Sequence, residues 1–175
     1  MSTTVIRNTR DISPVLRRQR TFPAAVQKVM TQAMRRATFT LEAEAAKRTP
    51  VGVGDSATGH LRASITSEVR GTPARVRGIV GSPSDYGLAV ELGSRPHWPP
   101  KGVMKRWAQL KLGLSEKKAG EIEYVLRRSI SRKGTPAVKM FTTAFSASRS
   151  RIDTFFTAAM RRVARKHFGS GSPER

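Results

Sequence analysis

Apolar residues recur along the chain at two different spacings, and these spacings divide it into helical and strand-like parts. Between residues 21 and 48 they stand three and four positions apart, as on one face of an amphipathic helix. These residues are Phe22, Val26, Val29, Ala33, Ala37, Leu41 and Ala45. Thr21 is suited to cap this helix and Pro23 to its first turn, while Pro50 disfavours helical geometry in the residue before it. The pattern predicts a long helix from Thr21 to about Arg48.

A period of two replaces the helical spacing between about residues 61 and 81. One face of the expected first strand carries Leu61, Ala63, Ile65 and Val69, and one face of the second carries Val76, Gly78 and Val80. Arg75, Arg77 and Ile79 alternate with the second set, and the stretch 71–74 supplies turn residues. This pattern predicts an antiparallel hairpin with one buried face. Because a lone hairpin is only marginally stable in water, the neighbouring helices must cover that face.

Helical spacing returns after the hairpin in four stretches. The spacing predicts a short helix over residues 86–92, which Gly93 ends, and a basic helix over residues 102–112, which Gly113 interrupts. It predicts a further helix over residues 115–132. The last helix is expected over 141–168, broken or bent at the polar stretch 146–150. The predicted fold class is therefore α+β, a small antiparallel sheet packed by a long N-terminal helix and C-terminal helices.

The length of 175 residues suits one domain with short additions at its ends. We expect residues 1–20 to form an extended basic arm that docks on a neighbouring subunit or stays mobile. Residues 21–168 are expected to form a single α+β domain that includes the helical segment 102–132. Residues 169–175, rich in Gly and Ser, are expected to be a flexible tail.

The net charge is +21, from 33 basic and 12 acidic residues, and it indicates a polyanionic partner. The alternative is a solvated basic surface that only maintains solubility. Candidate contacts with DNA or with an acidic partner are Arg17, Arg18, Arg20, Arg132, Lys133, Arg161, Arg162, Arg165 and Lys166. For Arg132 and Lys133 an equally good interpretation is stabilisation of the helix dipole.

Catalytic chemistry has no recognisable constellation in the sequence. His60, His97 and His167 are far apart, no Gly-x-Ser-x-Gly occurs, and the absence of cysteine excludes thiolate chemistry and disulfides. Gly54 and Gly59 have the spacing of a phosphate-binding loop, but the Lys-Ser/Thr pair is missing. We expect no catalytic residue, no cofactor and no metal site. No apolar run is long enough for a membrane span, and no secretory signal is recognisable.

The chain resembles the tail-completion, or head-tail joining, proteins of long-tailed bacteriophages, most clearly over residues 49–94. The residues that carry the resemblance are Thr49, Pro50, Val51, Gly59, Leu61, Arg62, Ser64, Ile65, Tyr86, Val90, Glu91, Gly93 and Ser94. The resemblance extends over roughly residues 22–145. In the family a second proline usually precedes the aromatic pair near the last helix, whereas this chain has Lys139 before Met140 and Phe141. Glu91 is interpreted as a structural ion pair or a cap rather than a catalytic base.

The resemblance implies a non-enzymatic virion protein of the phage neck, assembled in the host cytoplasm. It implies a ring of copies, six- or twelve-fold, between portal-adaptor proteins and tail-terminator or tail-tube proteins, with DNA passing through. Candidate protein-interface residues are Val5, Ile6, Val15, Leu16, His97, Trp98, Phe155 and Phe156. Trp98, held on a proline-rich loop, is interpreted either as a contact anchor or as part of the chain's own core. The alternative function is a basic nucleic-acid-binding or packaging protein without sequence specificity.

Overall fold

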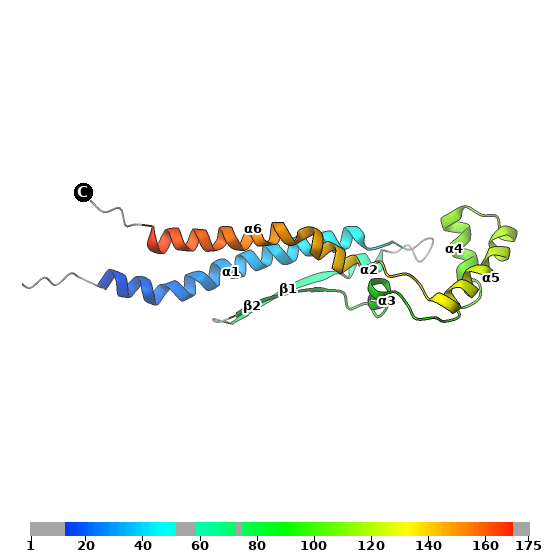
Figure 1. Ribbon diagram of the computed structural model, residues 1–175, viewed down its shortest axis with the longest axis horizontal. Coiled ribbons are helices and arrows are strands. Elements are labelled where there is room, and N and C mark those ends of the chain that lie inside the picture. The colour runs from blue at the N-terminus through cyan, green and yellow to red at the C-terminus, as the bar shows by residue number, and fades with distance from the viewer. Residues whose placement is uncertain (1–12, 52–58, 73–74, 170–175) are drawn as a thin grey trace, which may run out of the picture.

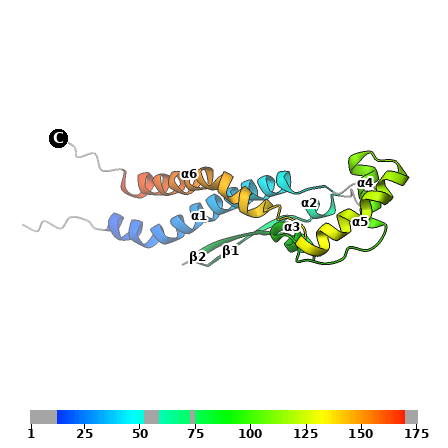
Figure 2. The ribbon, with the colours of Figure 1, turned by 45° about the vertical axis from the view of Figure 1, so that its right-hand side comes forward.

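A computed structural model describes residues 13–51, 59–72 and 75–169, and it is an elongated molecule built on two long helices (Figure 1). Helix α1 (Ser13–Arg48) and helix α6 (Met140–Phe168) run antiparallel and side by side in both views (Figures 1 and 2). A β-hairpin lies along α1, and two further helices form the end of the molecule away from Ser13 and Phe168. The fold is α+β, as the sequence predicts.

The contact between α1 and α6 is made mainly by small side chains. The small buried residues are Ala33, Ala37 and Ala45 on α1, and Ala144, Ser148, Ala159 and Val163 on α6, and the larger Met140 is also buried at the start of α6. Small side chains let two helices approach closely, so the pair forms one continuous support along the molecule. At its end, the Phe22 ring meets the rings of His167 and Phe168, each with centroids 5.4 Å apart. The start of α1 therefore lies beside the end of α6.

The hairpin consists of β1 (Thr66–Thr72) and β2 (Arg75–Gly81), paired antiparallel. Val69 stands opposite Gly78 on the face toward α1. A β-carbon on Gly78 would overlap side-chain atoms of Thr38 and Met34, so only glycine allows this close approach. The alternation expected for the second strand is thus confirmed, with Val76 and Val80 half-buried and Arg75, Arg77 and Ile79 exposed.

The first strand begins later than the sequence predicts. Residues 60–63 form a short helix, α2 (His60–Ala63), and β1 starts only at Thr66. Leu61 and Ile65, four positions apart, are buried, while Ala63 between them is exposed. Burial in this stretch therefore follows the spacing of a helical turn and not the alternation of a strand. The expectation of a strand from residue 61 was wrong. Leu61 and Ile65 fit both a strand and a helical turn, and Ala63 is small enough to be exposed to solvent.

Helix α1 begins earlier than the sequence predicts, and helix α6 lacks the predicted break. Helix α1 begins at Ser13, so residues 13–20 are helical rather than an extended arm, and Pro23 lies inside the helix. The Thr21 hydroxyl donates to the Arg17 carbonyl oxygen, 3.1 Å away, instead of capping a helix start. Helix α6 is continuous through residues 146–150, because Ser148 is buried and the Ser146 hydroxyl donates to the Thr142 carbonyl oxygen of its own helix.

The remaining helices are confirmed within one or two residues. They are α3 (Gly87–Leu92), followed by Gly93, α4 (Val103–Leu112), followed by Gly113, and α5 (Glu116–Lys133). Helices α4 and α5 pack on each other at the far end of the molecule and form what we call the appendage, residues 101–133. Among the described residues, no helix is long and apolar enough to cross a membrane.

Candidate functional site

Of the motif residues that carry the family resemblance, Val51 and Tyr86 are exposed. Seven others gather with Gly134, Thr135 and Met140 where α1 ends and α6 begins. We call this cluster the joint: Thr49, Leu61, Arg62, Ser64, Glu91, Gly93, Ser94, Gly134, Thr135 and Met140. Thr49 is 1% exposed, and its N–H and its hydroxyl both donate to the Ala45 carbonyl oxygen, at 3.0 and 2.8 Å. Its hydroxyl oxygen also lies 3.2 Å from the sulfur of Met140, the first residue of α6. Thr49 therefore ties the last turn of α1 to the first turn of α6.

Arg62 and Leu61 add the short helix α2 to the joint. The Arg62 guanidinium donates a hydrogen bond to the Thr49 carbonyl oxygen at 2.9 Å, just beyond the end of α1. Carbonyl groups at a helix end have no N–H partner within the helix, and Arg62 supplies one. Leu61 is 2% exposed and lies so close to Gly87 that a β-carbon there would stand 3.4 Å from its Cδ1 atom. Gly59 precedes α2 with a φ of 62°, a left-handed conformation that glycine adopts without strain. These contacts attach α2 to both α1 and α3.

Two serine hydroxyls connect α2 to the segment that follows β2. The hydroxyl oxygens of Ser64 and Ser82 are 2.7 Å apart, and the Ser64 hydroxyl also bonds to the Leu61 carbonyl oxygen at 2.9 Å. Ser82 Oγ in turn accepts a hydrogen bond from the N–H of Ser84 at 3.1 Å. The entry to β1 and the exit from β2 are thus held together outside the strand ladder.

Glu91 caps helix α6 from a distance of about fifty positions in the sequence. Its Oε2 accepts from the N–H of Phe141 at 2.8 Å, and its Oε1 accepts from the N–H and the hydroxyl of Thr142 at 3.0 and 2.7 Å. Burial acts to raise the pKa of Glu91, but hydrogen bonds from Thr142, Phe141 and Met140 outweigh it and hold the pKa below its usual value. The carboxylate is used as a helix cap, as the sequence interpretation allowed.

Gly93 and Gly134 allow the segment that leads into the appendage and the segment that leaves it to contact each other. Both have a positive φ, 78° and 72°, with ψ of 170° and −161°. A β-carbon on either would overlap the facing backbone, at Thr135 for Gly93 and at Ser94 for Gly134. Between them, Ser94 and Thr135 form an isolated bridge in which each N–H bonds to the other's hydroxyl at 3.0 Å. The appendage is therefore anchored through a narrow, fixed neck.

Lys139 occupies the position at which the family that the motif residues resemble usually has proline. It stands just before α6 with a φ of 56°, and its N–H donates to the Glu91 carbonyl oxygen at 3.1 Å. Proline has no N–H and is confined to a φ near −65°, so it fits neither feature. The loop before α6 therefore has a conformation of its own in this chain.

His97 and Trp98 lie in the loop that runs along α5. The Trp98 side chain is 55% exposed, and the Arg127 guanidinium stands 5.5 Å from its ring centroid. Arg127 also donates to the Pro99 carbonyl oxygen at 2.8 Å, and the Tyr124 ring lies 6.4 Å from Trp98. Trp98 thus packs on one side against α5 and keeps the rest of its surface in solvent.

The predicted basic contacts separate into two groups at opposite ends of the molecule. Exposed Arg17 and Arg20, on the first turns of α1, share one end with the cluster on α6 (Arg161, Arg162, Arg165 and Lys166), whereas Arg132 and Lys133 end α5 in the appendage. The side chains of Val15, Leu16 and Arg18 are not described, and Val5 and Ile6 lie outside the described residues. The structure therefore brings together only the first group.

Two adjoining hollows along α6 are lined by these arginines. One, of about 820 Å³, lies along α6 and is lined by Arg149, Arg161 and Arg165, with Asp153 as its single carboxylate. The other, of about 330 Å³, lies between the two long helices and is lined by Arg36, Arg162, Arg165 and half-buried Phe155. None of these arginines forms an ion pair within the described part of the chain. We call this surface the basic groove.

Arg36 and Arg149 belong to the basic groove but were not among the residues predicted from the sequence. Their positions in helical stretches showed only that they do not lie on the apolar face of the helix. A helical period does not tell which polar residue faces a neighbouring helix, so no sequence signal distinguished Arg36 from Arg35. Phe156, predicted as an interface residue, is half-buried and lines a separate small hollow with Val26, Met30 and Val76.

The N-terminal part of the chain matches one protein-family model. Residues 15–93 match the model described as "Bacteriophage HK97-gp10, putative tail-component". The matched stretch contains α1, the hairpin and α3, and it ends before the appendage and α6, so it is shorter than the resemblance noted over residues 22–145. No curated protein and no solved structure matches the chain. The match relates residues 15–93 to phage tail components, which are structural proteins of the virion.

Proposed function

We propose that this protein is a structural component of the phage neck that completes the tail and joins it to the head. In this proposal its copies form a six- or twelve-fold ring, seated between portal-adaptor proteins and tail-terminator or tail-tube proteins, through which DNA passes. The single observation that carries the proposal is the match of residues 15–93 to a phage tail component. The neck position and the ring rest on the resemblance of the motif residues.

The shape and charge of the molecule support this role. An elongated helix pair with an anchored appendage offers separate surfaces at its two ends for neighbouring rings. The appendage has ten basic residues against three glutamates, and residues 140–168 have six basic residues against one aspartate. Uncompensated cations on both parts would repel in a ring of identical copies until DNA or acidic partners neutralise them. We therefore propose that ring formation is coupled to docking.

The experiment that tests the proposal has two parts. A density map of the intact particle should place the chain at the junction of head and tail, and any other location contradicts the proposal. The mass of the purified protein, free of nucleic acid, is then measured alone and with capsid or tail components. We expect a ring only in the mixtures. A stable ring of the pure protein at low salt contradicts the coupling, and a persistent monomer that binds DNA but neither component favours the packaging alternative.

A further inference from the structure

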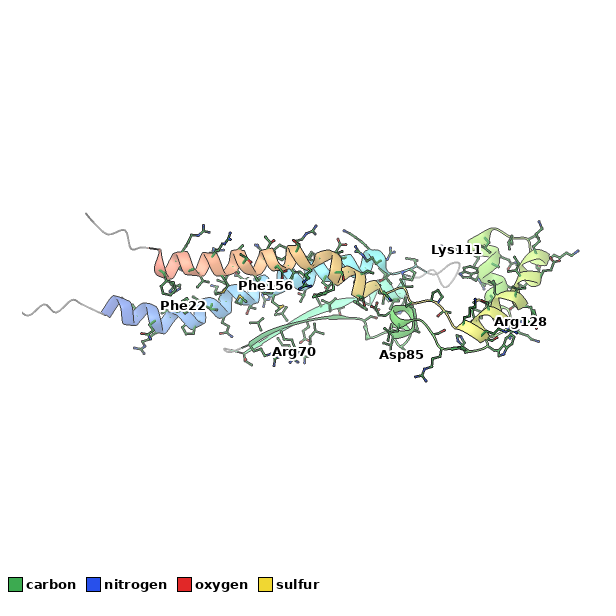
Figure 3. All side chains as sticks on the ribbon, viewed as in Figure 1. Phe22, Arg70, Asp85, Lys111, Arg128 and Phe156 are labelled. Atoms are coloured by element: carbon green, nitrogen blue, oxygen red, sulfur yellow. The ribbon has the colours of Figure 1, made fainter. Side chains whose placement is uncertain are left out.

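The outward face of the hairpin carries three arginines in a small area. Arg70 on β1 stands directly opposite Arg77 on β2, and Arg75 follows at the next outward position of β2. All three are exposed, and they line a shallow hollow of about 240 Å³ together with Gly71, Thr72 and Ile79. Figure 3 shows Arg70 on the side of the hairpin away from α1. We call this surface the hairpin arginine face.

Only one of the three guanidinium groups is neutralised within the described residues. Glu68 accepts two hydrogen bonds from Arg70, at 2.7 and 2.8 Å, and this bidentate pair lowers the pKa of Glu68. No carboxylate of the described chain pairs with Arg75 or Arg77. Like charges directly opposite each other destabilise an antiparallel pair, so this arrangement adds nothing to the stability of the hairpin. It is suited instead to an external anion.

The geometry points to duplex DNA as that anion: we propose that the hairpin arginine face binds the phosphate backbone of double-stranded DNA. The opposite face of the hairpin packs on α1, so a polyanion meets the three arginines from the solvent side. Guanidinium groups bind phosphate oxygens in bidentate geometry, and such contacts carry no sequence information. The inference rests on the proposed function for the presence of DNA, but it assigns the contact to residues outside the predicted basic contacts.

An acidic protein surface is a poorer fit for this face. Protein interfaces usually have an apolar or aromatic centre with charges at the rim. The outward residues of the hairpin include one large apolar side chain, Ile79, which is 42% exposed, and no aromatic residue. By contrast, the appendage exposes Tyr124, and the loop that runs along it exposes Trp98. A protein partner is therefore expected at the appendage rather than on the hairpin arginine face.

The test compares two triple variants of the full chain that lose the same charge. One carries Arg70→Ala, Arg75→Ala and Arg77→Ala, and the control carries Lys111→Ala, Lys117→Ala and Arg128→Ala in the appendage. Figure 3 shows Lys111 and Arg128 at the end of the molecule away from Arg70. Binding to a random duplex of about 30 base pairs is measured by fluorescence anisotropy at several salt concentrations. Each lost phosphate contact should reduce the slope of log K against log salt by about 0.9.

For the hairpin variant we expect the slope to fall by about 2 to 3 and the affinity at about 0.1 M salt to fall at least ~10-fold. The control should change by less than ~3-fold, with a slope change below about 1. Equal losses in the two variants, or an unchanged hairpin variant, would overturn the inference. So would tighter binding of wild-type protein to poly-glutamate than to a duplex of equal charge.

A second variant covers the case in which the alanine substitutions unfold the hairpin. Arg70→Lys, Arg75→Lys and Arg77→Lys together keep the charge and remove the planar donor pair, so we expect the slope to be kept and the affinity to fall several-fold. An affinity equal to that of the wild type would contradict a bidentate contact. This inference and the proposed function fail separately, because the location in the particle is measured without the duplex and the affinity is measured without the particle.

Discussion

At the joint, the polar side chains find partners within the chain, whereas the outward face of β1 and β2 leaves two guanidinium groups without a carboxylate among the described residues. Thr49 is buried with its hydroxyl bonded, and Glu91 accepts three hydrogen bonds at the start of α6. Arg75 and Arg77 form no ion pair with any described residue. Polar groups that are hydrogen-bonded inside a protein hold its fold together, whereas exposed charges without an ion pair indicate a binding partner.

The joint should therefore respond to mutation through stability, and the hairpin arginine face through binding. Both regions contain polar and charged residues, so residue type does not separate them. The partners of each side chain do.

The largest effect is expected for Gly134→Ala. Its φ and ψ lie in a region that only glycine adopts readily, and the added β-carbon would meet the backbone of Ser94. We expect the free energy of unfolding to fall by about 3 kcal/mol, measured by urea denaturation. Gly120→Ala, on an exposed helical position of α5 with open space around it, is the control and should raise stability by about 0.5–1 kcal/mol. Similar effects in both variants would contradict the close contact at the neck of the appendage.

Sequence patterns predicted the helices better than they predicted the joint. The helices α3 to α6 follow from their own spacing and from the glycines that end α3, α4 and α5. The contacts of the joint instead connect Thr49 to Met140, Glu91 to Thr142 and Ser94 to Thr135, which are 91, 51 and 41 positions apart. A periodic pattern reports which face of one element is buried, and it holds no information about the element packed against that face.

The two errors at element boundaries have the same origin. Pro23 fits the first turn of a helix, yet α1 continues through it, because packing against α6 and the hairpin supports the helix where local propensity does not. Residues 61–65 fit both a strand and a helical turn, and burial of Leu61 and Ile65 together decided for the turn. Arg75 and Arg77 were correctly placed on the outward face of the hairpin, but the cross-strand register, with Arg70 opposite Arg77, came only from the structure.

Glu91→Gln should have the next largest effect. The variant keeps a cap acceptor but loses the charge that strengthens three hydrogen bonds, so we expect a loss of about 1–2 kcal/mol at pH 7 by urea denaturation. The pKa of Glu91 is lowered in the folded protein, so its contribution is present above the unfolded-state pKa and is lost as pH falls through the folded-state pKa.

The difference in stability between wild type and Glu91→Gln should therefore shrink at acidic pH. Glu44, Glu68 and Glu116 also have lowered pKa values, but they are present in both proteins and cancel in the difference. A difference that stays constant from neutral pH to about pH 3 would show that the charge of Glu91 does not support α6.

Thr49→Val is expected to be milder. Valine keeps the shape of the side chain and removes the hydroxyl, while the Ala45 carbonyl oxygen keeps the N–H of residue 49 as a partner. We expect a loss of about 1 kcal/mol by thermal or urea unfolding. The matched control is Thr154→Val on α6, where an exposed hydroxyl makes the same bond to a carbonyl oxygen four residues earlier, at 2.9 Å, and its loss should cost less than about 0.5 kcal/mol. Equal costs would mean that burial of Thr49 does not matter.

Glu68→Gln should leave stability nearly unchanged and increase binding. Glu68 and Arg70 form an exposed pair, and such pairs contribute little to folding. The carboxylate also competes with phosphate for the Arg70 guanidinium and repels a polyanion. If the hairpin arginine face meets DNA, removing this charge should raise duplex affinity by about 2- to 5-fold at low salt, and high salt should diminish the gain. The charge-matched control is Glu121→Gln in the appendage, which should raise affinity less. An equal gain in both variants would show that only net charge matters, and the distinction between the hairpin arginine face and the rest of the basic surface would be lost.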